Sequence, residues 1–560
     1  MTPDVDVLII GAGLSGLYQL HRVRELGLSV QVIEAGSDVG GTWYWNRYPG
    51  ARFDSESWSY GYSFSKEILQ EWEWTEHFSP QPDNLRYCQF VAERLDLRRD
   101  IRFGTRVVAA RWQEAARCWS VELDDGSVLN ARFLVTAIGA LTVPTLPRIA
   151  GIETFAGQSM HTARWPHEPV SFEGKRVGVV GTGATGVQTI QEVAKTAASL
   201  TVFQRTANWC APLLNARITP EEQRDIKARY DEIFERCRQS PGGFIHVPDP
   251  RSALEVSAEE REAFWEQRYA EPGFGIWMGN FKDVLTNREA NALLSDFVAR
   301  KIRARVHDPE VAERLIPRNH GFGTRRLPLE TRYYEVYNQP NVRLVDLRET
   351  PITRVVPGGV LTAAAAGRAG EGASGGAVNG SANGSANGSG DEQLHELDML
   401  IFATGFDALR GSYDALPIQG VDGLALRDYW SPGARTLFGM LNHGFPNLCM
   451  VLGPMGTYGN IPRSIEYNVE WVTDLLRHAR DHGLTRIEAT PESVEGWMEH
   501  VRASAQGLLS NEVDSWMTGV NTNVEGRSQR VLARYSGTLQ AFRDQAGAFS
   551  AAGYAGLRKG

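Results

Sequence analysis

The sequence predicts an α/β protein with two parallel β-sheets, because one strand–turn–helix–strand pattern occurs twice. Residues 5–10 form a short apolar run, glycines and a helical pattern follow, and residues 29–33 have the pattern of a second strand. The same plan returns at residues 176–180, which lead through glycines and a helix to a strand at 200–203. Two such openings in one chain imply two Rossmann-like dinucleotide-binding domains.

The composition is that of a large globular protein. The 560 residues carry a formal net charge of −9 without a long acidic or basic block, so we expect no nucleic-acid partner. No stretch approaches the roughly 20 apolar residues that span a bilayer, and no basic region precedes the first apolar run. The five cysteines form no CxxC pair, which is typical of reduced thiols in a cytoplasmic protein. We expect neither a membrane association nor a metal site, and the sequence does not indicate the oligomeric state.

The chain divides into interleaved segments. Charged residues at helical spacing, as at 220–230, predict a helical insertion in the second domain. Residues 363–391 are almost all Ala, Gly, Ser and Asn, a composition that buries too little surface to order itself, so we expect a disordered hairpin loop there. The expected organisation is a first domain in two parts at 1–150 and 341–540, a second domain at 151–340 with the insertion at about 219–315, and a C-terminal tail at 541–560.

The first glycine-rich turn has the pattern Gly11-x-Gly13-x-x-Gly16. Glycines at these positions let the backbone approach a pyrophosphate at the positive N-terminus of the following helix. Glu34 ends the next strand, where a carboxylate accepts hydrogen bonds from an adenosine ribose. This pattern favours FAD, and the alternative is a glycine-rich turn without a ligand.

The second turn, Gly181-x-Gly183-x-x-Gly186, is followed by a strand that ends at Arg205 and Thr206. A cation in place of the ribose-binding acid suits a 2′-phosphate, so this site favours NADP. The alternative is that Arg205 is an ordinary surface arginine. An FAD site and an NADP site in one chain together indicate hydride transfer from nicotinamide to flavin.

Three further stretches narrow the class of enzyme. Residues 155–166 match the pattern FxGxxxHxxxWP at every specified position, and residues 40–54 and 398–405 carry the motifs GGTWYWNRYPGARFD and DMLIFATG. The specified positions of the first pattern are Phe155, Gly157, His161, Trp165 and Pro166. By these motifs the chain resembles the Baeyer–Villiger monooxygenases from about residue 4 to about residue 540.

The resemblance implies that a ketone, O2 and NADPH give an ester or lactone. In that family a C4a-peroxyflavin attacks the ketone, and a fixed cation stabilises the negative charge. Residues 321–328 resemble the family's GTKR segment, which makes Arg326 the active-site arginine, Asp54 its partner and Arg325 a replacement for the usual lysine at the 2′-phosphate. The alternative is that Arg325 and Arg326 are a surface pair.

The resemblance also gives two residues a role near the cofactors. It implies that His161 couples cofactor motion to activity and that Trp516 lies on a loop that covers the nicotinamide. A satisfied structural histidine and a core tryptophan are the alternatives. The residues expected at FAD and NADPH are Gly11, Gly13, Gly16, Glu34, Trp43, Asp54, Gly181, Thr182, Gly183, Thr185, Gly186, Gln188, Arg205, Thr206, Arg325 and Trp516.

Two other classes stay open at this point: a flavin monooxygenase that oxidises amines or sulfides, and a non-catalytic dinucleotide-binding protein. The segment 453–466 resembles the version found in members that act on large cyclic ketones. A bulky or cyclic ketone is therefore the expected substrate.

Overall fold

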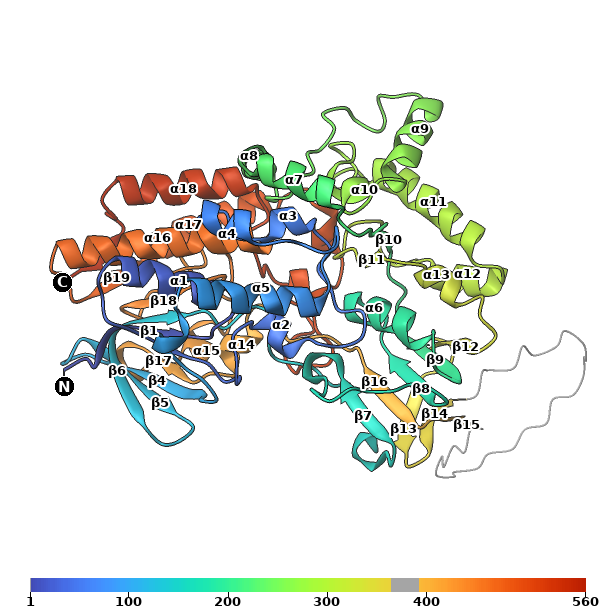
Figure 1. The fold of residues 1–560 in the computed structure, drawn as a ribbon, viewed down its shortest axis with the longest axis horizontal. Helices are drawn as coiled ribbons and strands as arrows, with labels where there is room; N and C mark the ends of the chain where they lie inside the picture. Colours follow the sequence, from blue (N-terminus) through green and yellow to red (C-terminus); the bar gives the residue numbers. More distant parts are fainter. Residues whose placement is uncertain (1, 364–391) are drawn as a thin grey trace, which may run out of the picture.

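The computed structural model describes residues 2–363 and 392–560, which form two α/β bodies side by side (Figure 1). The first body holds both described ends of the chain, and the second contains β7, β8 and β9. The expected loop at 363–391 lies, apart from Ala363, outside the described residues. Within the described part of the chain, no helix combines the length and the apolar character that crossing a bilayer requires.

The first body is built on an eight-stranded sheet. Its path runs β17-β4-β5-β6-β1-β2-β3, and β18 pairs with β6 beside that path. The strands are β1 (Val5–Ile10), β2 (Val30–Ile33), β3 (Ile101–Arg102), β4 (Val107–Gln113), β5 (Cys118–Leu123), β6 (Val128–Thr136), β17 (Ile418–Gln419) and β18 (Leu448–Met450). The sheet thus combines N-terminal and C-terminal strands, as the two-part first domain requires.

Helices from both ends of the chain cover this sheet. Helix α1 (Leu14–Glu25), which follows β1, packs against α16 (Ile461–Asp481), and α18 (Leu539–Ala551) packs on α16. Strand β20 (Leu557–Lys559) pairs with β19 (Ile487–Ala489). Residues 541–560, expected as a C-terminal tail, pack on this body, and buried apolar residues such as Phe542 dock them in its core.

The second body is built on a five-stranded parallel sheet with the order β12-β9-β8-β16-β7. Its strands are β7 (Gln158–His161), β8 (Arg176–Val180), β9 (Ser199–Gln204), β12 (Val342–Asp346) and β16 (Met399–Phe402). The expected boundary at residue 340 is wrong for β12 and β16, which pair in this sheet. All four residues of β16 are buried, which suits a strand with parallel neighbours on both sides.

Next to this sheet lies a three-stranded antiparallel sheet of β13 (Ile352–Val356), β14 (Gly359–Ala363) and β15 (Glu392–Glu396). Val355 and Val360 from it pack with Phe203, Leu400 and Phe402 of the parallel sheet. The chain therefore returns to the first body only after β16.

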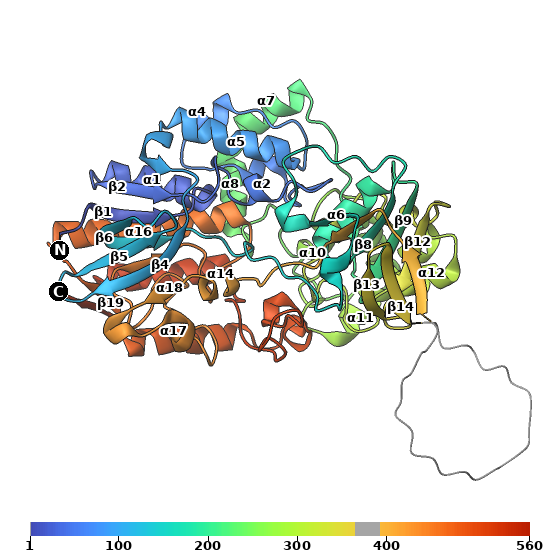
Figure 2. The same cartoon turned by 90° about the horizontal axis from the view of Figure 1, so that it is seen from below.

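The expected insertion is helical. Between β10 (Ala211–Pro212) and β11 (Leu329–Glu330) lie α7 (Pro220–Ala228), α8 (Tyr230–Gln239), α9 (Ala258–Tyr269), α10 (Gly275–Met278), α11 (Arg288–Arg305) and α12 (Pro309–Leu315). Helix α8 packs against α3 (Ser57–Tyr60) and α18, so the first two helices lean on the first body (Figure 2). The insertion therefore bridges the two bodies.

Candidate functional site

At Gly11 and Gly16 the first glycine turn leaves no room for a side chain. Gly11 has φ +101°, and a Cβ on Gly16 would stand 1.8 Å from the Gly11 carbonyl oxygen. Gly13 caps α1 and lies against Gly41, whose Cα is 3.3 Å from the position of a Cβ on Gly13. The turn therefore packs backbone against backbone at the N-terminus of α1, where the first N–H groups have no partner within the helix.

Glu34 is fixed at the end of β2 by backbone donors. Its Oε2 accepts the N–H of Ala12 at 2.7 Å, and its Oε1 accepts the N–H of Gly36 at 2.7 Å. The residue is buried, with 5% of its surface exposed. Each carboxylate oxygen keeps a further lone pair for a ribose hydroxyl.

Trp43 lies in α2 (Thr42–Trp45) within a buried aromatic cluster. Its Nε1 donates to the hydroxyl of Tyr60 at 3.1 Å, and its ring meets Phe53 edge-on with centroids 5.9 Å apart. Trp43 therefore supports the irregular segment that leads to Asp54.

Asp54 and Arg326 form an ion pair where the two bodies meet. Nη1 of Arg326 lies 2.5 Å from Oδ2 of Asp54, and the two side chains are 35% and 2% exposed, respectively. Burial raises the pKa of Asp54, and the charge of Arg326 opposes that shift. A buried carboxylate thus holds a guanidinium that remains open to a ligand.

The side chain of Gln188, in the helix after the second glycine turn, forms hydrogen bonds with residues of the first body. The hydroxyl of Tyr48 donates to Gln188 Oε1 at 2.8 Å, and Gln188 Nε2 donates to the carbonyl of Arg52 at 3.1 Å. Residues 48–54, which carry Asp54, are thereby docked on α6 (Ala184–Val193). The same contact borders a cavity of about 310 Å³ between the bodies. Both ends of the Gln188 amide are used by the protein, which gives no support to its expected contact with a cofactor.

The second glycine turn repeats the geometry of the first. Gly181 has φ +106°, and a Cβ on Gly186 would stand 2.3 Å from the Gly181 carbonyl oxygen. Gly183 caps α6 and has open space around it in the described part of the chain. Thr182 Oγ1 donates to the carbonyl of Thr206 at 2.9 Å. The hydroxyl oxygens of Thr185 and Thr162 are hydrogen-bonded at 3.2 Å.

Two arginines lie near the end of β9. Arg205 is exposed, and its Nη1 donates to Thr522 Oγ1 at 2.8 Å. The Nε of Arg325 is buried and has no hydrogen-bond partner among residues 2–363 and 392–560. Burial lowers the pKa of Arg325, Asp514 raises it, and Arg205 lowers it. A pair of neighbouring cations with an unused donor suits an anion such as a phosphate.

The fingerprint at 155–166 lies along the edge of the second sheet. A Cβ on Gly157 would stand 2.4 Å from the carbonyl oxygen of Asp398 and 2.8 Å from the Phe155 ring. Trp165 is buried in the core of the second body, and Pro166 is half-buried beside it. Four of the five positions thus hold β7 and its continuation in place.

His161, at the end of β7, is tied to the residues that follow β16. Its Nδ1 accepts the N–H of Ala163 at 3.0 Å, so the ring proton is on Nε2, which lies 3.3 Å from Thr404 Oγ1. Thr404 in turn donates to the carbonyl of Thr145. Burial lowers the pKa of His161 to about 4, so the ring is neutral near pH 7.

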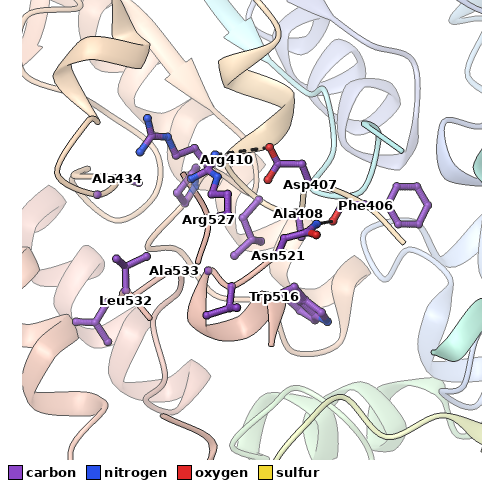
Figure 3. Close-up of a pocket in the computed structure, with 16 residues that line it drawn as sticks. Phe406, Asp407, Ala408, Arg410, Ala434, Trp516, Asn521, Arg527, Leu532 and Ala533 are labelled. Atoms are coloured by element: carbon purple, nitrogen blue, oxygen red, sulfur yellow. Dashed lines mark hydrogen bonds and ion pairs between the residues drawn. The ribbon is translucent and has the colours of Figure 1, made fainter. Parts of the chain in front are cut away.

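Trp516 begins the 3-10 helix η6 (Trp516–Thr518) at the rim of a narrow pocket of about 40 Å³ (Figure 3). Half of the residues that line the pocket belong to the stretches 406–410 and 519–521. At its far side Arg527 pairs with Asp414, which also binds Arg410 Nε at 3.0 Å. The C-terminal segment is therefore packed against the chain that follows β16.

Comparisons with known proteins show the family of this chain. A family model described as flavin-binding monooxygenase-like matches residues 5–237. A 2-oxo-Δ3-4,5,5-trimethylcyclopentenylacetyl-CoA monooxygenase of Pseudomonas putida is 44% identical over 96% of this chain and 95% of its own length. Cyclohexanone 1,2-monooxygenase of an Acinetobacter species is 40% identical over 96% and 94%.

The chain belongs to the Baeyer–Villiger monooxygenases. A crystal structure of OTEMO in complex with FAD and NADP matches this Baeyer–Villiger monooxygenase with a TM-score of 0.92, at 42% identity over 100% of both chains. A phenazine N-monooxygenase of Lysobacter antibioticus is 38% identical over 99% of the chain and 96% of its own length. Relatives at this level of identity therefore include a protein named as an N-monooxygenase.

The structure of this Baeyer–Villiger monooxygenase brings together most of the expected site. Asp54 and Arg326 meet, and Arg205 and Arg325 lie close to one another. Sequence reasoning missed the contacts of Tyr48 with Gln188 and the ion pair of Arg527 with Asp414. Neither has a local sequence signal, because each joins residues more than 100 positions apart.

Proposed function

We propose that Arg326, oriented by Asp54, is the residue at which this enzyme oxygenates a ketone. The observation that carries the proposal is the ion pair of 2.5 Å between them at the junction of the two bodies. As a Baeyer–Villiger monooxygenase the enzyme depends on FAD and NADPH, and it converts a ketone, O2, NADPH and a proton into an ester, NADP⁺ and water. Bound FAD, once reduced by NADPH, supplies the activated oxygen.

The residues of the chain fit these cofactors. For FAD we propose the first glycine turn, with Glu34 at the ribose and Trp43 and Asp54 on the segment beside it. For NADP we propose the second turn, Gly181 to Gly186, with Arg205, Thr206 and Arg325 at the 2′-phosphate. The unused donor of Arg325 and the close backbone packing at the glycines of both turns support this assignment within the described residues.

Arg326 acts by its charge. Arginine stays protonated at any working pH, so its positive charge is always available to stabilise the oxyanion that forms on the ketone carbonyl. Asp54 is a positioning residue, since its buried carboxylate fixes the guanidinium. Trp516 and its segment exclude water from the nicotinamide end of the site.

We also propose a bulky or cyclic ketone as substrate. The segment 453–466 carries the motif of members with large cyclic substrates, and the names of two relatives specify cyclic ketones. Its position supports this role, because Asn460 Nδ2 donates to the carbonyl of Ser59 at 3.3 Å and Arg463 donates to the carbonyl of Gly61. The segment thus packs on the chain just beyond Asp54.

Arg326→Ala tests the proposal. The variant is expected to keep FAD and to be reduced by NADPH, yet to form no ester from a ketone, because the lost cation acts after reduction. Lys195→Ala, in an exposed ion pair with Glu192, is a matched control for removing a positive charge. Ester formation by Arg326→Ala at near wild-type rates overturns the assignment. A phenazine in the substrate panel tests the N-oxidising alternative.

A further inference from the structure

Arg534 lies beside the segment that carries the large-ring motif. The N–H of Met455 donates to the carbonyl of Ala533 at 3.5 Å, and the N–H of Tyr535 donates to the carbonyl of Gly456 at 3.1 Å. Arg534 is the residue between these two backbone hydrogen bonds. Its backbone is therefore fixed next to the part of the chain that we assign to the substrate.

The two neighbours of Arg534 in the chain have different surroundings. Ala533 lines the narrow pocket that Trp516 borders (Figure 3). Tyr535 packs in the core of the first body, with its ring centroid 5.2 Å from that of Trp497. Arg534 therefore lies where the core of the first body meets the wall of a pocket.

The guanidinium of Arg534 has no counter-ion within residues 2–363 and 392–560, because no carboxylate oxygen there lies within 4.0 Å of its nitrogens. In this part of the chain its one side-chain hydrogen bond runs from Nη1 to the carbonyl of Tyr535, at 3.3 Å. A guanidinium has five N–H donors, so most of those of Arg534 are unused by the described residues.

The other two arginines of residues 520–535 do have carboxylate partners. Arg527 Nη2 lies 2.5 Å from Asp414 Oδ2, and Arg530 Nε lies 2.6 Å from Asp514 Oδ1. The missing partner is thus a property of the position of Arg534 and not of the whole segment.

The environment of Arg534 is unfavourable for an isolated charge. The residue is half-buried, and burial lowers the pKa of its guanidinium without a carboxylate to oppose the shift. A cation that protein encloses costs free energy unless an anion replaces the water it has lost. Because part of the side chain stays accessible, an anion from outside the chain can reach it.

We propose that Arg534 binds a carboxylate of the substrate and thereby selects ketones that carry an acidic group. The inference rests on the proposed function, because it takes the segment beside Arg534 as part of the substrate site. The planar guanidinium matches a carboxylate through two parallel hydrogen bonds, and it stays charged at any working pH. Arg534 holds the acidic end of the substrate and takes no part in oxygen transfer, which occurs at Arg326.

The experiment measures steady-state oxygenation by the FAD-loaded enzyme with saturating NADPH. The substrates are 3- and 4-oxocyclohexanecarboxylate and their methyl esters, which differ from the acids only in the charge and the added methyl group. Wild type should have a lower KM for at least one acid than for its ester. Arg534→Gln should raise the KM for that acid about ten- to a hundredfold, and it should leave the kcat for the acid and both constants for the ester unchanged.

Two further variants separate the contact from the charge. Arg534→Lys should recover part of the lost affinity for the acid, because lysine keeps the charge but not the paired geometry. The matched control is Arg502→Gln in α17 (Pro491–Ser504), which removes an exposed arginine that pairs with Glu495 at 2.8 Å. This control should leave the ratio of the two KM values at the wild-type level.

An inhibition experiment with wild type needs no variant. Cyclohexanecarboxylate, which has no ketone, should compete with the ester substrate at about a tenfold lower concentration than methyl cyclohexanecarboxylate does. This result decides the proposal if Arg534→Gln does not fold or does not retain FAD.

The proposal is overturned if wild type shows no lower KM for either acid, or if both inhibitors act equally. It is also overturned if Arg534→Gln changes the KM for acid and ester by the same factor. All these results leave oxygenation of ketones intact. Wild-type enzyme that oxygenates neither the acids, nor the esters, nor cyclohexanone would instead contradict the proposed function itself.

Discussion

Removing Arg326 should make the stability of the protein depend on pH in a specific way. In the native protein the carboxyl of Asp54 is 2% exposed and has the Arg326 guanidinium 2.5 Å away. Arg326→Ala leaves that carboxylate buried without its counter-ion. Burial already raises the pKa of Asp54, and the variant loses the charge that opposes this rise.

The sign and size of the effect follow from this geometry. A carboxyl whose folded pKa lies above its unfolded value of about 3.9 keeps its contribution to stability at low pH and loses it as the pH rises through the folded pKa. Breaking a buried ion pair costs about 3–5 kcal/mol. Because Arg326 is 35% exposed, we expect Arg326→Ala to lose free energy of unfolding at the lower end of this range, about 3 kcal/mol, at high pH. Near pH 5 the loss should be smaller.

The assay is urea denaturation of the FAD-loaded protein between pH 5 and pH 9, followed by tryptophan fluorescence. The midpoint of Arg326→Ala should fall relative to wild type as the pH rises. The double variant Asp54→Asn/Arg326→Ala has no buried charge, so its deficit should stay constant. A deficit of Arg326→Ala that is the same at every pH, or an equal slope in the double variant, would show that the buried Asp54 carboxylate does not cause the pH dependence.

Three further changes test other parts of the site. Arg205→Ala should raise the KM for NADPH about ten- to hundredfold more than the KM for NADH, since only NADPH carries the phosphate, and equal effects would contradict the assignment. For His161, an NMR titration should give a pKa near 4, and a measured value near 6.5 would show that burial does not lower this pKa. The neutral ring stabilises the fold above about pH 6.5, and this contribution to stability is lost as the pH falls toward 4. Tyr48→Phe should lower the free energy of unfolding by about 1 kcal/mol and add nothing further in a Gln188→Leu background, and additive losses would mean that the two side chains act independently.

The sequence predicts best those parts of the fold that local patterns encode. Both glycine turns are where their spacing placed them, because Gly11 and Gly181 need a positive φ that other residues rarely adopt. The position of β16 could not be predicted in this way. Its four buried apolar residues specify a strand but not the sheet that the strand joins, which depends on pairing with β8 and β7.

Local sequence patterns likewise predict some contacts of the site and not others. The motifs place Asp54 and Arg326 in one site although 271 positions separate them, and the structure confirms that their side chains meet. The orientation of Gln188 depends instead on the docking of one body on the other, which no local pattern contains. The C-terminal segment is a further case, since the partners of Asn521 and Thr522 follow different strands.

Insertion of oxygen beside a ketone carbonyl at Arg326 can be measured on the product. The most direct measurement supplies purified enzyme with FAD, NADPH, a cyclic ketone such as cyclohexanone or a larger ring, and ¹⁸O2, and then determines the mass of the product. We expect a lactone with one ¹⁸O atom from wild type, and reduced flavin without lactone from Arg326→Ala. Consumption of NADPH by wild type without labelled ester or lactone from any ketone of the panel, or labelled lactone from Arg326→Ala at the wild-type rate, would contradict the account.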